Sequence, residues 1–170
     1  MKKFILVCVF LIIGLNAYCF KSFEVNPFDF IGTREIAILK EFGVNIDDIP
    51  FNIPVIEADN LTEFVNLSYA PYCTAGVTIN GMIYIQNRNY LLKRFNITLE
   101  HEIFHVILHN LGLPHWFEEG LVCELTEEWK DKKRSIIDVE KNSLENLETQ
   151  WELESYSYSC WLRVKEIMGF

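Results

Sequence analysis

Alternating apolar and polar residues predict a short β-sheet in the first half of the chain. Two β-rich runs, residues 77–79 and 82–85, flank an Asn-Gly pair whose members both tolerate positive φ. This pattern predicts a two-residue β-hairpin. Residues 53–57 predict a further short strand, and Pro54 marks it as an edge or irregular strand because it lacks an N–H donor.

Helical periodicity surrounds these predicted strands. Thr33 can cap a helix that runs to about Phe42, and Gly43 follows as a typical end. A capping-box pattern at residues 60–63 predicts a short helix that reaches Leu67. The first half of the chain therefore predicts a mixture of helices and strands.

The second half of the chain is predicted to be mainly helical. The longest helical pattern begins near Asn89 or Asn96 and runs to Leu111, and its several apolar faces predict burial. A second helix is expected from about His115 through Glu128. Residues 143–168 predict a mostly helical end, with these core candidates: Trp151, Leu153, Trp161, Leu162 and Ile167.

The first residues resemble a targeting segment rather than part of the fold. Lys2 and Lys3 precede an apolar run over residues 4–15, and Ala17-Tyr18-Cys19 follows it. Residues 1–19 are therefore predicted to be a secretory signal peptide cut near Cys19, which implies a secreted or periplasmic location. An uncleaved membrane anchor is the alternative, although a spanning helix needs about 20 apolar residues.

Charge and cysteine content narrow the class of protein. The chain has 15 basic and 24 acidic side chains, which gives a net charge of −9. Removal of the signal would take away Lys2 and Lys3 and leave 13 basic and 24 acidic side chains, a net charge of −11. This balance argues against a nucleic-acid partner, which needs a basic face. The charged run at residues 130–134 predicts a solvated turn, with a site for anions as the less favoured alternative.

Three cysteines remain once Cys8 and Cys19 are assigned to the signal, and they are Cys73, Cys123 and Cys160. An odd number allows at most one internal disulfide. We expect mostly buried free thiols, with a Cys123–Cys160 disulfide as the alternative.

The candidate chemistry lies in the segment His101-Glu102-Ile103-Phe104-His105, inside the longest predicted helix. Residues four apart on an α-helix lie about 40° apart around its axis, so both imidazoles can converge on one zinc ion. Glu102 can then accept a proton from a zinc-bound water without binding the ion itself. The segment predicts a catalytic metal site.

A catalytic zinc site needs a third protein ligand. The spacing excludes the metzincin pattern, because Leu108 and Leu111 occupy its Gly and His positions. His109 lies about 12 Å along the helix axis from His101, too far to share an ion. A carboxylate from the next helix is the better geometric solution, and the full set of candidates downstream is His109, His115, Glu118 and Glu119.

The segment at residues 101–105, followed by Trp116-Phe117-Glu118-Glu119-Gly120-Leu121, resembles the gluzincin metallopeptidases, specifically the peptidase-MA-like and minigluzincin group. This resemblance implies that Glu119 is the third zinc ligand, with Glu118 as the alternative. It also implies an edge strand that holds the substrate backbone, for which residues 82–86 are the candidate. A later tyrosine would stabilise the oxyanion, with Tyr156 as the first candidate and Tyr158 as the second.

Together these features predict an α+β fold of the small gluzincin (zincin) type, with a short sheet and hairpin packed on the active-site helix and further helices after it. Residues 20–170 would form one domain, with an α/β part at 20–95 and a helical zinc-binding part at 96–170. The expected function is a zinc metallopeptidase that hydrolyses peptides or proteins, with Glu102 as general base. The alternatives are an exported zinc-binding pseudoenzyme and a metal-free, membrane-anchored interaction domain.

Overall fold

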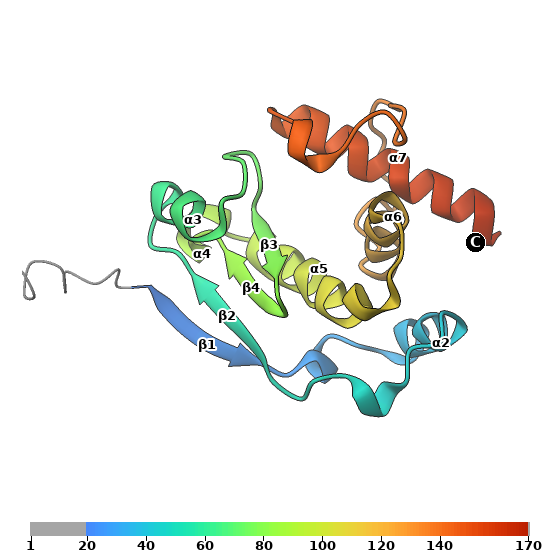
Figure 1. Cartoon of the computed structure of the whole chain (residues 1–170), viewed down its shortest axis with the longest axis horizontal. Helices are drawn as coiled ribbons and strands as arrows, with labels where there is room; N and C mark the ends of the chain where they lie inside the picture. Colours follow the sequence, from blue (N-terminus) through green and yellow to red (C-terminus); the bar gives the residue numbers. More distant parts are fainter. Residues whose placement is uncertain (1–19, 170) are drawn as a thin grey trace, which may run out of the picture.

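The computed structural model describes residues 20–169 and shows an α+β arrangement, as predicted (Figure 1). Its strands form one sheet in the order β1-β2-β4-β3. Helix α5 packs on β3 and β4, α6 packs on α5, and α7 packs on α6. The predicted signal peptide, residues 1–19, lies outside the described residues. Within residues 20–169, no helix is both long and apolar enough to span a bilayer.

The predicted hairpin is present, formed by β3 (Gly76–Ile79) and β4 (Met82–Ile85) in antiparallel pairing. Asn80 and Gly81 have φ values of 51° and 75°, as a two-residue turn of this kind requires. Ile83 and Ile85 of β4 are fully buried and pack into the core beneath α5. The hairpin therefore anchors the sheet to the helix that carries the candidate metal ligands.

Two predictions about the sheet edges are wrong. Strand β2 (Ile53–Glu57) is internal, because the unpredicted β1 (Lys21–Val25) pairs with it on one side and β4 on the other. Pro54 is tolerated there because it precedes the residues of β2 that pair with β4. The strand proposed to hold substrate, residues 82–86, is also internal, and β3 forms the edge instead.

The two helices of the first half begin close to their predicted positions. Helix α2 (Thr33–Glu41) is capped at Gly32 rather than Thr33, and the Gly32 N–H donates to the Glu35 carboxylate at 2.9 Å. Helix α3 (Leu61–Ser68) is capped by Asn60, whose side-chain oxygen accepts from the Glu63 N–H at 3.0 Å. Side-chain capping explains both starts, because it satisfies N–H groups that have no partner inside the helix.

The long predicted helix is divided in the structure. A short α4 (Arg88–Leu91) ends at Leu92, whose φ of 51° breaks the helix, and α5 (Arg94–Leu108) then begins. A 3-10 turn follows α5, and Gly112 ends it with a φ of 62°. The chain then turns into α6 (His115–Leu125), which stops before Glu128.

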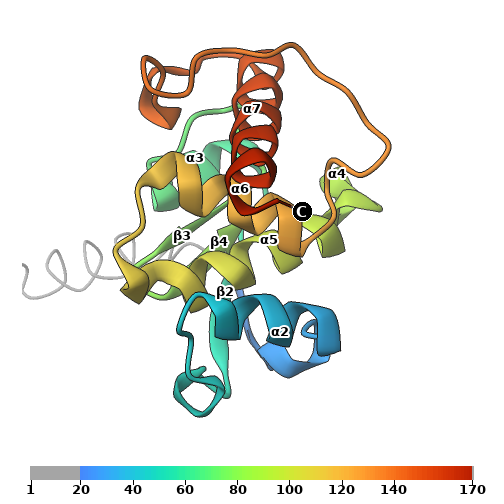
Figure 2. The same cartoon turned by 90° about the vertical axis from the view of Figure 1, so that its right-hand side faces the viewer.

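The last helix, α7 (Gln150–Met168), is shorter than the predicted helical segment, because only a 3-10 turn at Leu144–Asn146 precedes it. Trp151 and Ile167 are 58% and 56% exposed, so their assignment to the core is wrong. The other core candidates on α7 are partly buried against small apolar clusters: Leu153, Trp161 and Leu162. Figure 2 shows α7 lying across α6, joined to it by a long segment.

The cysteines follow the preferred prediction. Cys123 and Cys160 are fully buried and Cys73 is partly buried, and all three are free thiols. The alternative Cys123–Cys160 disulfide is therefore not formed.

Close packing of α6 on α7 depends on Gly120. A β-carbon at this position would lie 2.4 Å from the carbonyl oxygen of Cys160, a distance that real contacts do not reach. The backbone of α6 can therefore approach α7 only with glycine here, and this approach brings the neighbouring Glu119 towards Ser157.

We expect Gly120→Ala to lower the free energy of unfolding by about 3 kcal/mol, because the extra methyl must push two helix backbones apart. Urea unfolding with a fluorescence readout would measure it. Gly43→Ala is the control: no atom lies within 4 Å of the place its methyl would take, so it carries only the strain of a φ of 79°, about 1 kcal/mol. Equal losses for the two variants would contradict the requirement for close packing at Gly120.

Candidate metal centre

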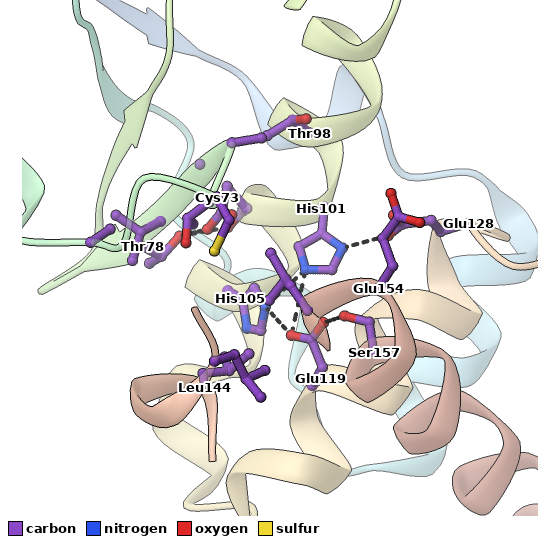
Figure 3. Close-up of a pocket in the computed structure, with 18 of the residues that line it drawn as sticks. Cys73, Thr78, Thr98, His101, His105, Glu119, Glu128, Leu144, Glu154 and Ser157 are labelled. Carbon is purple, nitrogen blue, oxygen red and sulfur yellow. Dashed lines mark hydrogen bonds and ion pairs between the residues drawn. The ribbon is translucent and has the colours of Figure 1, made fainter. Parts of the chain in front are cut away.

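Three side chains from two helices converge at one end of a cavity (Figure 3). His101 and His105 project from adjacent turns of α5, and their Nε2 atoms are 3.1 Å apart. Glu119 of α6 places Oε2 3.6 Å from His101 Nε2 and 3.3 Å from His105 Nε2. These residues could hold a metal ion, and they are the set expected from the sequence.

The other nitrogen of each imidazole is held by a carboxylate. His101 Nδ1 lies 3.1 Å from Glu128 Oε2, and His105 Nδ1 lies 2.7 Å from Glu118 Oε1. A carboxylate accepts hydrogen bonds, so each Nδ1 carries the proton and each Nε2 of a neutral ring presents a lone pair. Carboxylates that orient histidine ligands in this way are typical of metal sites.

With both rings neutral, three electron pairs point at one another without a donor between them, which is unfavourable unless a cation lies among them. Ligand atoms bound tetrahedrally at about 2.0–2.1 Å from one ion lie about 3.3 Å from each other. The observed separations of 3.1 to 3.6 Å match that spacing. The donor set thus fits a small divalent metal ion.

Protonation is the other way to relieve this repulsion. Burial alone would lower the pKa of His101, but the negative charges of Glu119 and Glu128 raise it well above its usual value. The pKa of His105 is likewise lowered by burial but raised overall to about 9 by hydrogen bonds to Glu118 and Glu119. A metal ion must therefore compete with protons for this group.

Glu119 is held as an anion by its surroundings. Burial would raise its pKa, but the two imidazoles lower it well below its usual value. Its second oxygen, Oε1, accepts a hydrogen bond from the Ser157 hydroxyl of α7, and Cys123 Sγ lies 3.9 Å from the same atom. Ser157 thus leaves Oε2 directed at the histidines.

Glu102 lies beside the three converging residues and lines the same cavity, whose volume is about 740 Å³. Its Oε2 accepts a hydrogen bond of 2.9 Å from Thr78 Oγ1 on β3. Burial raises its pKa, and the neighbouring histidines only partly oppose this. Gly76 makes room for this side chain, because a β-carbon there would lie 2.9 Å from Glu102 Cγ.

The two candidate tyrosines do not reach the converging group. Tyr156 is 2% exposed, packs with Val139, Leu147 and Cys160, and is not one of the residues that line the cavity. The ring of Tyr158 packs between Trp129 and Trp161 at centroid distances of 5.8 and 5.7 Å. Successive residues on a helix are rotated by about 100°, so Tyr156 and Ser157 face different directions. Tyr156 faces the small apolar cluster, and Ser157 faces Glu119.

The remaining candidate ligands occupy other positions. His109 and His115 line the cavity but do not belong to the converging group. Glu118 contacts His105 Nδ1 rather than the shared centre. Sequence reasoning missed Ser157, Thr78 and the Nδ1 partner Glu128, since no motif spacing links residues that far apart in the chain.

The chain was compared with protein-family models, with curated proteins and with solved structures, and none of these comparisons found a match.

Proposed function

We propose that this chain is a zinc metallopeptidase of the gluzincin type. The observation that carries the proposal is the convergence of His101 Nε2, His105 Nε2 and Glu119 Oε2, with both Nδ1 atoms held by carboxylates, at a cavity that also contains Glu102. Two imidazoles and one carboxylate form a known ligand set of catalytic zinc sites. The small zincin fold expected from the sequence belongs to the same proposal.

An open cavity favours catalysis over a purely structural role, because structural zinc sites are closed by four protein ligands. When bound here, a zinc ion would supply Lewis acidity and lower the pKa of a coordinated water to about 7. His101, His105 and Glu119 would hold the ion, and all three line the cavity.

Glu102 is the proposed general base. Its carboxylate accepts a proton from the attacking water and returns it to the leaving amine. The Thr78 hydroxyl positions this carboxylate, and burial raises its pKa, which strengthens it as a base. Tyr156 has no role in this proposal, because it is buried away from the cavity.

A peptide is the proposed substrate because the cavity runs along an edge strand. Gly76, Val77 and Thr78 of β3 line it, and β3 pairs only with β4 within the described sheet. An extended peptide can bind such an edge by main-chain hydrogen bonds. This would bring a peptide bond next to Glu102, which contacts Thr78 on the same strand.

The test combines metal analysis with a peptide-library cleavage assay on the purified chain. We expect one zinc per chain, cleavage that a chelator abolishes, and recovery when zinc is restored. Zinc binding without cleavage would instead support the exported pseudoenzyme. A chain that binds no zinc would contradict both functions and favour the metal-free interaction domain.

A further inference from the structure

Basic side chains gather along the same cavity, although the chain as a whole is acidic. Arg94, Lys132 and Arg134 line the cavity, while the net charge of the chain is −9. Arg94 begins α5, and the other two lie in the segment that follows α6. Residues 130–134, for which the sequence predicts a solvated turn, therefore border the candidate active site through Lys132 and Arg134.

Five glutamates also line the cavity, and four of them lie at or beside the converging group: Glu102, Glu118, Glu119 and Glu128. The fifth, Glu154, pairs with one of the basic residues. Arg134 Nε lies 2.6 Å from Glu154 Oε2. Burial would raise the pKa of Glu154, but Arg134 and, more weakly, Arg94 lower it overall. The positive charges of both arginines therefore act on the Glu154 carboxylate. Arg94 and Lys132 form no ion pair with any carboxylate that the structure describes. Among the described residues, two positive charges at the cavity wall therefore have no carboxylate partner.

Trp129 contributes a rigid surface to this region. The guanidinium carbon of Arg134 lies 5.3 Å from the centre of its ring, and Lys132 Nζ lies 5.8 Å from it. Trp129 itself is 3% exposed and follows Glu128, the partner of His101. Lys132 and Arg134 thus both lie against Trp129, which is next in the chain to the carboxylate that holds His101.

The position of Arg94 gives a length scale. It precedes His101 by seven residues, so it lies on nearly the same face of α5, about 10.5 Å along the helix axis. An extended peptide advances about 3.3 Å per residue, so for a peptide that runs parallel to α5 this offset corresponds to about three residues of substrate.

We propose that Arg94 and Lys132 bind a carboxylate of the peptide substrate about three residues from the cleaved bond, which makes the enzyme selective for acidic peptides. The inference rests on the proposed peptidase function. The carboxylate belongs either to an Asp or Glu side chain or to the end of the peptide chain, because both present the same anion to a guanidinium.

The first measurement compares kcat/KM for peptides in which Glu, Gln or Lys is moved through each position around the cleaved bond. We expect Glu to be favoured over Lys by about tenfold at one position, since attraction of one charge and repulsion of the other each contribute. The preference should shrink in high salt. Peptides with free and amidated ends separate the two sources: loss of the preference on amidation assigns it to the chain end.

Charge-reversal variants locate the effect. Arg94→Glu and Lys132→Glu should each weaken or invert the preference for Glu over Lys peptides. Their matched controls are Lys93→Glu and Lys133→Glu, adjacent exposed residues that do not line the cavity. The controls make the same change in net charge and should keep the preference.

A binding measurement separates this inference from the peptidase proposal. The same peptides are titrated by fluorescence anisotropy into the zinc-loaded Glu102→Gln variant. Cleavage without a charge preference would overturn the inference and leave the peptidase intact. Preferential binding of Glu peptides without cleavage by the wild type would support the inference and reject the peptidase. Absence of both cleavage and preferential binding would overturn both.

Discussion

Glu102→Gln is expected to lower kcat by about 10³-fold while the metal stays bound. The amide keeps the shape of the side chain, and its carbonyl can still accept the hydrogen bond from Thr78, but it cannot accept a proton from water. Metal retention follows because Glu102 is not one of the three converging residues. Steady-state kinetics on a cleaved peptide, together with zinc stoichiometry, would measure both effects.

Glu100→Gln is the matched control for this variant. Glu100 lies two residues earlier on α5 and is also partly buried, and burial likewise raises its pKa, but it does not line the cavity. We expect its kcat to stay within about twofold of the wild type, as for a substitution away from the reacting groups. Wild-type rates in the Glu102→Gln variant would exclude Glu102 as the general base.

Glu119→Ala is expected to lose the metal. The substitution removes the only carboxylate oxygen in the converging group and leaves the Ser157 hydroxyl without its partner. The loss of affinity should exceed the factor of about 10–100 that is typical when a supporting carboxylate is removed. Competition titration with a chromogenic zinc chelator would give the affinity of each variant.

Glu118→Ala is the comparison that separates the two adjacent carboxylates. Glu118 contacts only the Nδ1 side of His105, so its removal should weaken binding by about 10–100-fold without abolishing it. A larger loss for Glu118→Ala than for Glu119→Ala would reverse the assignment of the third ligand. Unchanged affinity in Glu119→Ala would remove Glu119 from the site altogether.

Local signals in the sequence were sufficient for the hairpin and for the start of α6. An Asn-Gly pair determines the turn because both residues accept positive φ, and Pro114 determines where a new helix starts. The four-residue spacing of His101 and His105 also specifies how their side chains lie relative to each other, because both lie on one helix. These features depend on residues close together in the chain.

Errors arose where a feature depends on distant residues. The sequence predicts residues 53–57 as an edge or irregular strand, because nothing in the local pattern of β1 shows that it covers β2. The edge strand that the resemblance implies at residues 82–86 is internal, because β2 and β3 lie on either side of it. Trp151 was assigned to the core from its apolarity, yet it lies at the exposed start of α7. Pairing order and burial are set by which elements meet, and the sequence of one element does not contain that information.

The order of residues along α5 is enough to specify that the two imidazoles project from adjacent turns of a buried helix with the Glu102 carboxylate beside them, since four-residue spacing on an α-helix leaves little choice. Geometry selects Glu119 over the other candidates for the third ligand only in the folded chain, because that choice depends on how closely α6 approaches α5 and α7. The same packing brought Ser157 to Glu119, placed Glu128 and Glu118 behind the histidines, and buried Tyr156. Contacts between helices set these positions, and each joins residues that are distant in the chain.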